Sequence, residues 1–380
     1  MAATTRTRVS PKAERVVGQV REVSIERIVP GGWGFAHDGR RTIFVDLAAP
    51  GDKALVQIDR VQGRVAFASI VELIDASPDR VEPPYPAAIA AGADFQHLSY
   101  ESQLAAKVAI VQDCLKRIGR IEDVPEIDIV PSPQPWGYRM VAEWHHDVER
   151  EVLGSFRRGT RQVIDVEHDP LALPALNDVL RDLRERLHHG TLPASAKTFR
   201  AAAGDQEATF VPTLDGQPPV ELTRTIGEEM YRFDARGFFQ VHPGLLTELI
   251  TETHRNLQEE TGYAVDLFGG VGVLTLPLAR RFGRVTMVES DPTAAAYAVR
   301  NAEQAGLRHV QVQVQPAEDW LGARSRRADP SFVLLDPPRS GVDARVVAGI
   351  LRMSPERITY VSCDPATLAR DLRGLLTKGY

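Results

Sequence analysis

The carboxyl-terminal part of the sequence alternates short apolar runs with segments of helical periodicity. After about residue 235, apolar runs at 264–268, 285–289, 332–335 and 358–361 are separated by turns and by patterns typical of helices. Strands that alternate with helices in this way are typical of a parallel α/β sheet. We therefore predict a Rossmann-like α/β domain over residues 234–380.

The preceding sequence divides into three further regions. Residues 1–14 are small and polar, which is typical of a disordered tail. Short β-rich runs between Gly- and Pro-rich turns predict a small β-barrel over residues 15–75. A proline-dense linker at 82–86 and helical periodicity at 100–118 open residues 76–233. A strand at 152–156 and a helix at 173–187 make this a central α+β region.

Composition narrows the class of protein further. The chain has 380 residues, of which 43% are apolar and 25% charged, as expected of globular domains. It has no run of eighteen apolar residues and no hydrophobic amino-terminal segment, so we predict a cytoplasmic protein without a membrane span. Cys114 and Cys363 are the only cysteines, which excludes a disulfide framework and an all-cysteine metal site. We expect Cys114 to pack in a core.

Charge gives only weak guidance about nucleic acid. The net charge is −6, but residues 1–70 carry eleven Lys and Arg against seven Asp and Glu. Barrels of this size commonly bind single-stranded nucleic acid, so Trp33 and Phe35 are either nucleotide contacts or core residues. Similarly, Arg157, Arg158 and Arg161 form either a solvated surface or a substrate contact.

Cys363 lies where a strand meets a helix. The apolar run at 358–361 precedes it, Asp364 is suited to cap a helix, and Pro365 to occupy its first position. The positive end of a helix dipole favours the thiolate form of a neighbouring cysteine and so makes it a better nucleophile. The alternative is an inert, buried cysteine.

Asp336 ends the apolar run that precedes this one, and Pro337 and Pro338 follow it. In a doubly wound sheet, ligands bind outside the carboxyl ends of the strands. Asp336 and Cys363 would therefore face the same crevice.

A glycine-rich turn follows the first strand of this sheet. Gly269, Gly270 and Gly272 lie between the run at 264–268 and a predicted helix at 274–282, and Glu289 ends the next strand 19 residues after Gly270. Glycines let the backbone approach a ligand, and an acidic residue at this spacing accepts hydrogen bonds from ribose hydroxyls. These residues fit either a dinucleotide or S-adenosylmethionine.

Four motifs together resemble the S-adenosylmethionine-dependent RNA 5-methyluridine methyltransferases. They lie at residues 237–241, 266–272, 335–341 and 360–371, and residues 96–100 and 153–159 also fit the family. By this resemblance the barrel is a TRAM domain that binds RNA. The resemblance assigns Cys363 to attack on C6 of uracil, and six residues to the cofactor S-adenosylmethionine: Gln240, Phe268, Gly270, Gly272, Glu289 and Asp336. The substrate would be a uridine of ribosomal or transfer RNA, extruded from its stack, with no obligate protein partner.

Three departures from the family pattern matter. The cysteines that hold an iron–sulfur cluster in many members are absent, so we expect no cluster. His242 stands where Asn is usual. The sequence ends at Tyr380, before the segment whose Glu takes the C5 proton in relatives, so we expect the methyltransferase domain to be incomplete at its carboxyl end.

Two alternative functions stay open: an amino-group methyltransferase that uses the Asp-Pro-Pro motif, and a non-catalytic RNA-binding protein that retains the fold.

Overall fold

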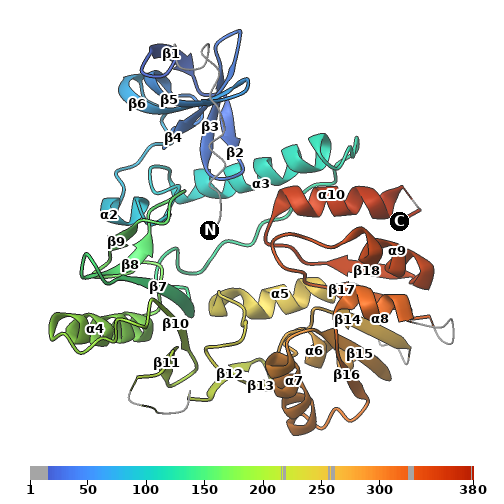
Figure 1. Cartoon of the computed structure of the whole chain (residues 1–380). Coiled ribbons are helices and arrows are strands. Elements are labelled where there is room, and N and C mark those ends of the chain that lie inside the picture. Colours follow the sequence, from blue (N-terminus) through green and yellow to red (C-terminus); the bar gives the residue numbers. More distant parts are fainter. Residues whose placement is uncertain are drawn as a thin grey trace, which may run out of the picture. The chain divides into compact units, whose positions relative to one another are not determined.

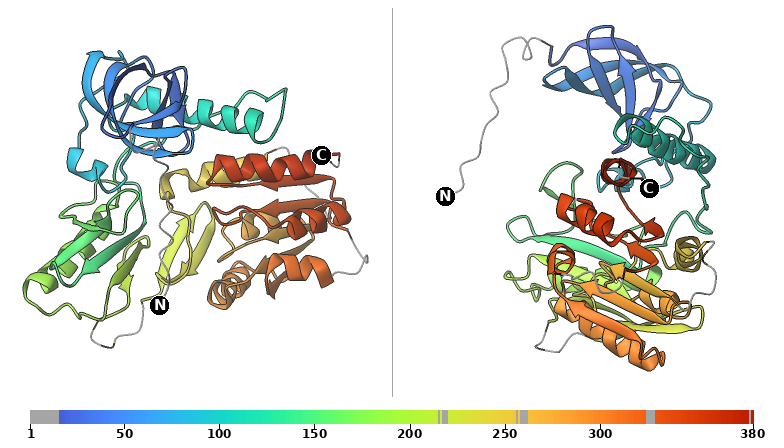
Figure 2. Two further views of the ribbon diagram at one scale, coloured as in Figure 1. Left: turned by 45° about the horizontal axis from the view of Figure 1, so that its top comes forward. Right: turned by 90° about the vertical axis from the view of Figure 1, so that its right-hand side faces the viewer.

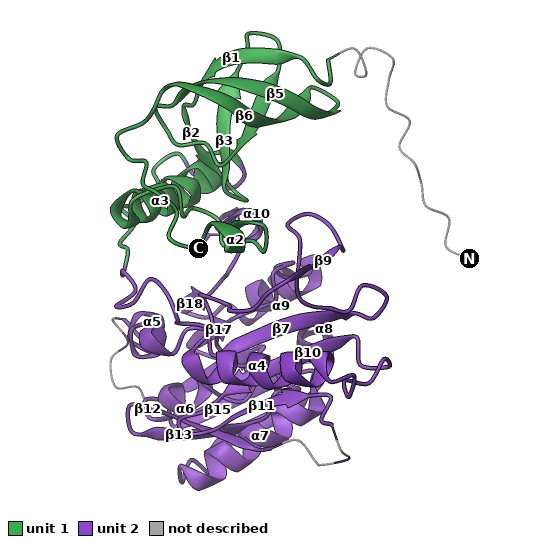
Figure 3. Ribbon diagram, turned by 90° about the vertical axis from the view of Figure 1, so that its left-hand side faces the viewer, with its two compact units in different colours: residues 1–117, 122–129 green, residues 118–121, 130–380 purple. Residues whose placement is uncertain are grey.

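A computed structural model describes residues 16–214, 216, 220–255, 257, 262–323, 329–377, 379 and 380. The predicted disordered tail, residues 1–14, lies outside the described residues. The chain forms two compact units, residues 1–117 with 122–129 and residues 118–121 with 130–380 (Figure 3). The boundaries inferred from the sequence at residues 75 and 233 stay predictions.

The first unit contains a six-stranded barrel-like sheet with the order β1-β5-β6-β4-β3-β2 (Figure 1). Its elements are β1 (Val20–Ser24), β2 (Arg27–Val29), β3 (Trp33–His37), β4 (Thr42–Asp46), β5 (Lys53–Gln62), β6 (Val65–Asp75), α2 (Pro86–Ile89) and α3 (Tyr100–Arg117). Alternate residues of the strands point inward and form an aliphatic core, including Ile43, Val45 and Val56. The predicted barrel is confirmed, and Cys114 is buried on α3 as expected.

The second unit begins with a five-stranded antiparallel sheet of order β11-β10-β7-β8-β9. Its elements are β7 (Val141–Asp147), β8 (Val152–Phe156), β9 (Val163–Asp165), α4 (Pro174–His188), β10 (Thr198–Ala203) and β11 (Ala208–Val211). Leu176, Leu180 and Leu183 of α4 pack with Trp144 and Phe199 of the sheet. The predicted strand at 152–156 has the predicted bounds.

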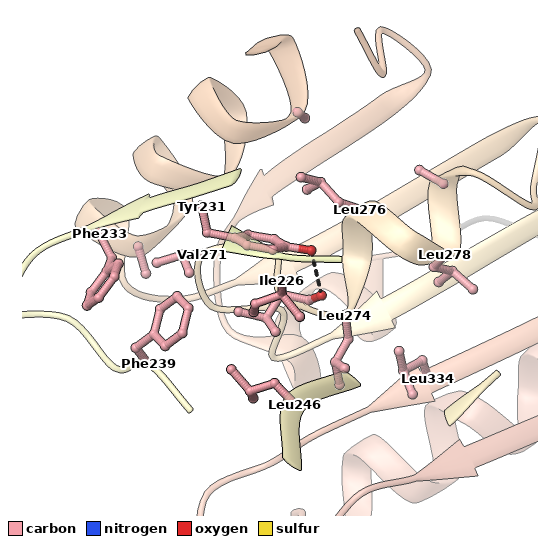
Figure 4. Packing of buried hydrophobic residues seen from close by; sticks show 14 of the residues in the cluster. Ile226, Tyr231, Phe233, Phe239, Leu246, Val271, Leu274, Leu276, Leu278 and Leu334 are labelled. Atoms are coloured by element: carbon pink, nitrogen blue, oxygen red, sulfur yellow. Dashed lines mark hydrogen bonds between the residues drawn. The ribbon is translucent and has the colours of Figure 1, made fainter. Parts of the chain in front are cut away.

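A hairpin joins this sheet to the α/β part of the same unit. It consists of β12 (Leu222–Ile226) and β13 (Glu229–Phe233), followed by η1 (Pro243–Leu245) and α5 (Leu246–Thr253). The ring of Phe239 stacks on Phe233 at 4.2 Å and meets Tyr231 edge-on at 6.4 Å (Figure 4). Tyr231 donates a hydrogen bond of 3.2 Å to the carbonyl of Val273, just after the glycine-rich turn. These contacts fix residues 237–241 beside that turn.

The remaining residues form the predicted parallel sheet, of order β16-β15-β14-β17-β18 (Figures 1 and 2). Its elements are β14 (Tyr263–Leu267), α6 (Thr275–Ala279), β15 (Arg284–Glu289), α7 (Pro292–Gln304), β16 (Val310–Val314), α8 (Ala317–Ala323), β17 (Phe332–Leu335), α9 (Ala344–Met353), β18 (Arg357–Tyr360) and α10 (Pro365–Leu376). Residues of α6 and α7 pack on one face of the sheet, and residues of α8, α9 and α10 pack on the other. The predicted α/β class is confirmed. Among the described helices, none is both long and apolar enough to cross a membrane.

Candidate functional site

Four neighbouring strands of the parallel sheet end level with one another. Leu267 at the end of β14 pairs with Val288 of β15 and with Leu335 of β17, and Leu335 in turn pairs with Tyr360 of β18. The residues that follow these strands therefore share one edge of the sheet, where ligands bind in folds of this kind.

The glycine-rich turn after β14 has a backbone in the left-handed region at three positions. Phe268, Gly270 and Gly272 have φ angles of +66°, +57° and +92°, and the left-handed region is costly for residues other than glycine. A Cβ atom on Gly269 would lie 2.5 Å from the side chain of Met287. Phe268 adopts this conformation although it is not glycine, as do five other described residues that include Leu47 and Glu151.

Glu289 closes the turn from the neighbouring strand. Its Oε2 accepts a 2.9 Å hydrogen bond from the backbone N–H of Gly270, and its Oε1 accepts one of 2.7 Å from that of Asp291. The side chain is half-buried. The spacing of 19 residues seen in the sequence thus corresponds to a direct contact between Glu289 and Gly270.

Asp336 binds a residue that is far away in the sequence. The side-chain amide of Gln240 donates a 2.7 Å hydrogen bond to its Oδ2. Burial raises the pKa of Asp336, whereas the hydrogen bond from Gln240 lowers it. The structure therefore brings Gln240 to the strand edge that carries Asp336.

Cys363 is exposed and lies between β18 and α10. The side chain of Asp364 caps α10 by accepting 2.9 Å hydrogen bonds from the backbone N–H groups of Ala366 and Thr367, as predicted. The backbone N–H of Asp364 also donates to the hydroxyl of Ser362 at 3.1 Å. The thiol thus stands in a turn that is fixed on both sides, and the buried alternative for Cys363 is wrong.

Helix α10 also holds the loop that follows Asp336, which the sequence did not reveal. Asp371 accepts hydrogen bonds through one oxygen from the backbone N–H of Val342, at 2.9 Å, and from the hydroxyl of Tyr360, at 2.8 Å. Arg370 donates to the carbonyl of Ser340 at 2.9 Å. These hydrogen bonds connect the segment that follows Asp336 to the segment that follows Cys363. In the sequence, the charged residues Arg370 and Asp371 within the motif at 360–371 could have indicated such contacts.

Asp266 was also missed as a separate site residue. It lies in β14, is 1% exposed, and accepts a 2.5 Å hydrogen bond at Oδ2 from the hydroxyl of Thr275. Burial, together with the neighbouring carboxyl groups of Asp336 and Glu289, raises its pKa to about 7. In the sequence, an acidic residue inside an otherwise apolar strand could have indicated that Asp266 is a site residue.

His242, which departs from the family pattern, connects the site to the segment before β7. Its Nε2 lies 2.9 Å from the hydroxyl of Ser132, and its ring stacks on Tyr138 at 4.7 Å. A pocket with a volume of about 280 Å³ is lined by His242 and Gln240 together with leucines of η1 and α5.

The outer face of the barrel carries four aromatic rings that are not part of its core. Trp33 and Phe67 meet at 5.3 Å, Phe67 and Phe44 at 5.6 Å, and Phe44 and Phe35 at 6.3 Å. All four rings are half-buried and alternate along their strands with the core residues. The core interpretation of Trp33 and Phe35 is therefore wrong.

Two arginines cover this aromatic face. The guanidinium of Arg27 lies 3.9 Å from the ring centre of Phe35, and that of Arg60 lies 3.6 Å from the ring centre of Phe67. Rings that alternate with cations suit stacking with bases and contact with phosphates.

The arginine cluster predicted in the central region lies in the connection between β8 and β9. Arg157 and Arg161 are exposed and Arg158 is half-buried. Next to them, the ring of Phe156 stacks on His145 at 3.6 Å and is 38% exposed.

The fold and the strand-end residues together define a class I methyltransferase with an attached β-barrel. A family model described as tRNA (Uracil-5-)-methyltransferase matches residues 221–378, and another described as TRAM domain matches residues 14–71. An uncharacterized RNA methyltransferase of Halalkalibacterium halodurans is 31% identical over 95% of this chain and 92% of its own length. The chain belongs to the S-adenosylmethionine-dependent RNA 5-methyluridine methyltransferase family, as its motifs predicted.

One further relative agrees with this assignment, and one solved structure shares the fold. The 23S rRNA (uracil(1939)-C(5))-methyltransferase RlmD of Methylococcus capsulatus is 30% identical over 94% of this chain and 90% of its own length. The crystal structure of the Pyrococcus abyssi tRNA (uracil-54, C5)-methyltransferase in complex with S-adenosyl-L-homocysteine has a TM-score of 0.71 and 22% identity. That match covers 93% of this chain and 92% of the other, and it shows that the two proteins share a fold.

Proposed function

We propose that this protein transfers a methyl group from S-adenosylmethionine to C5 of a uridine in RNA, through a covalent bond between Cys363 and C6 of the base. The observation that carries the proposal is the placement of Cys363. Its thiol is exposed at the start of α10, at the end of the strand that pairs with the one leading to Asp336. A structural cysteine would more often be buried.

The residues at the strand edge fit the cofactor. In the turn formed by Phe268, Gly270 and Gly272, an added Cβ atom on Gly270 would meet nothing within 4 Å, so a ligand could approach the backbone closely there. We assign Glu289 to the ribose hydroxyls, and Gln240 with Asp336 to the methionine end. When bound, the cofactor supplies an electrophilic methyl group on a positively charged sulfur, which suits an edge lined by carboxyl groups.

Cys363 makes the reaction possible because C5 of uracil is a poor nucleophile. The Cys363 thiolate adds to C6, and the electron pair of the C5–C6 double bond moves toward O4 to give an enolate. C5 of this enolate then forms a bond to the methyl carbon, and the electrons of the broken carbon–sulfur bond stay on the cofactor sulfur. Loss of the C5 proton to a base restores the double bond and expels the Cys363 thiolate.

The aromatic face of the barrel supports RNA as the substrate. Base–aromatic stacking is tolerant of sequence, so the four rings with Arg27 and Arg60 suit unpaired nucleotides of any identity. In the second unit, Phe156 with Arg157 and Arg161 offers another combination of ring and cations. We propose that both surfaces contact the RNA strand that carries the target uridine.

The named relatives act on two classes of RNA. RlmD is named for 23S rRNA, whereas the solved Pyrococcus structure is named for tRNA. We therefore propose ribosomal or transfer RNA as the substrate, and a cytoplasmic location stays a prediction.

The test uses radiolabelled S-adenosylmethionine with ribosomal RNA or transfer RNA that lacks 5-methyluridine. Wild type is compared with Cys363→Ala and with Cys114→Ala, which replaces the buried cysteine of α3 and serves as the matched control. We expect labelled 5-methyluridine with wild type and Cys114→Ala, and none with Cys363→Ala. The RNA that accepts the label identifies the substrate class.

Two results would contradict the proposal. Methyl transfer to a base nitrogen that persists in Cys363→Ala would indicate an amino-group methyltransferase. Cofactor and RNA binding without turnover on either RNA would indicate a non-catalytic RNA-binding protein.

A further inference from the structure

Asp266 is a buried carboxyl group with only part of its hydrogen-bonding capacity used. Thr275 donates to Oδ2, but Oδ1 is buried and has no hydrogen-bond partner among the described residues. A buried carboxylate oxygen without a donor is costly, so its presence calls for an explanation. The proposed cofactor site lies at the same strand edge, because Asp266 is followed by Leu267 and then by the glycine-rich turn.

The charged groups that act on Asp266 from the neighbouring strands are both acidic. Glu289 ends β15 and Asp336 follows β17, while α6 contributes the neutral hydroxyl of Thr275. Three carboxyl groups thus meet at one edge, and two of them, Asp266 and Asp336, have a raised pKa. Because no positively charged group among the described residues acts on it, the protonated form of Asp266 is favoured below neutral pH.

The cofactor and its product differ in charge at the reacting atom. The sulfur of S-adenosylmethionine is a sulfonium with a positive charge, and the sulfur of S-adenosylhomocysteine is a neutral thioether. A positive charge at this edge favours ionisation of the neighbouring carboxyl groups, and a neutral sulfur does not.

We infer that Asp266 distinguishes the charged cofactor from its uncharged product by releasing a proton to solvent when S-adenosylmethionine binds. After the methyl group has left, the neutral sulfur of the product no longer favours the carboxylate, and Asp266 takes a proton back from solvent. Asp266 is a specificity-determining residue in this account, and the hydroxyl of Thr275 orients it. The inference rests on the cofactor site proposed above.

Calorimetry without RNA tests the inference. Wild type is titrated with S-adenosylmethionine and with S-adenosylhomocysteine at pH 7, in phosphate and in Tris, whose ionisation enthalpies differ. We expect release of about half a proton with S-adenosylmethionine, since Asp266 titrates near pH 7, and clearly less with S-adenosylhomocysteine. In Asp266→Asn, proton release should disappear. The preference for S-adenosylmethionine should fall about fivefold, because a pKa shift of about one unit favours the ionised form tenfold and about half of Asp266 is already ionised at pH 7.

Two control variants separate Asp266 from the other acidic residues. Asp234→Asn changes another buried aspartate, outside the proposed site, and should leave proton release unchanged. Asp336→Asn removes the second carboxyl group with a raised pKa. Proton release that persists in Asp266→Asn, or that is lost only in Asp336→Asn, would overturn the inference.

The comparison of the two ligands in the wild-type protein also tests the inference, so the test does not depend on whether the variants fold. Equal proton release with the two ligands would overturn the inference whatever the variants show. The calorimetric measurement uses no RNA and does not depend on Cys363. A failure of the proposed methylation reaction can therefore be distinguished from a failure of the proposed proton release by Asp266.

Discussion

The side-chain amide of Gln240 donates a 2.7 Å hydrogen bond to the carboxyl group of Asp336, across 96 residues of sequence. Gln240 follows Phe239, which is buried against Phe233 and Tyr231 (Figure 4). The contact therefore joins the segment beside the hairpin to the edge of the parallel sheet, and it aligns two residues that we assign to the methionine end of the cofactor.

Gln240→Ala should weaken binding of S-adenosylmethionine. A hydrogen bond to a charged group contributes about 1.5–3 kcal/mol, which corresponds to an increase in Kd of about ten- to a hundredfold. Calorimetry measures the Kd, and Gln311→Ala on the exposed side of β16 serves as the control. An unchanged Kd in Gln240→Ala would remove Gln240 from the cofactor site.

Glu289→Gln should also weaken binding of S-adenosylmethionine, by about tenfold or more, because a neutral amide is a poorer acceptor for ribose hydroxyls. The variant keeps the size of the side chain at the turn of Gly270. Glu303→Gln, an exposed change on α7, controls for the loss of one negative charge. If both variants bind equally well, Glu289 has no role in holding the ribose.

Asp266→Asn should change how stability depends on pH. Burial raises the pKa of Asp266 from 3.8 to about 7 in the folded state, so its stabilising contribution is complete below pH 3.8 and is lost as the pH rises through 7. From pH 5 to pH 8, the free energy of unfolding of wild type should therefore fall relative to that of Asp266→Asn, by an amount on the order of a few kcal/mol. Urea denaturation at each pH measures this difference.

Asp234→Asn provides a control of opposite sign for that measurement. Burial tends to raise the pKa of Asp234, but hydrogen bonds from Arg236 outweigh it, and the pKa is lowered. Its stabilising contribution is therefore present above the unfolded-state pKa and is lost as the pH falls. A wild-type protein that gains stability relative to Asp266→Asn as the pH rises would contradict the assignment of Asp266 as a buried acid.

Phe44→Leu should weaken RNA binding with little effect on its salt dependence, because stacking carries no charge. Loss of one stacked base costs about 1–3 kcal/mol. Arg60→Gln should instead lower the slope of log affinity against log salt by about one. Val71→Ala, at a residue of β6 that is 58% exposed, is the control. Fluorescence anisotropy with a labelled single-stranded RNA distinguishes the cases, and equal affinity in all variants would exclude this face as a binding surface.

The sequence predicted features that depend on local pattern. The strands that end near Phe268, Glu289, Asp336 and Cys363 were readable from their apolar runs, and the cap formed by Asp364 from its position before Pro365. These features follow from period, capping and turn chemistry within a few residues.

Contacts between distant segments could not be predicted in this way. The bond from Gln240 to Asp336 and the contacts of Asp371 with Val342 and Tyr360 depend on how strands and loops pack in space. The side of the barrel to which Trp33 points could not be predicted either, because it depends on the register of β3 in the sheet.

The most direct test of the central claim uses RNA that contains 5-fluorouridine. Fluorine at C5 cannot leave as a proton does, so the bond between the nucleophile and C6 persists after methyl transfer. We predict a protein–RNA adduct that survives denaturation, forms with wild type and Cys114→Ala but not with Cys363→Ala, and maps by mass spectrometry to Cys363. Methylation of ordinary RNA by wild type without any adduct on 5-fluorouridine RNA, or an adduct on another residue, would contradict the proposed mechanism.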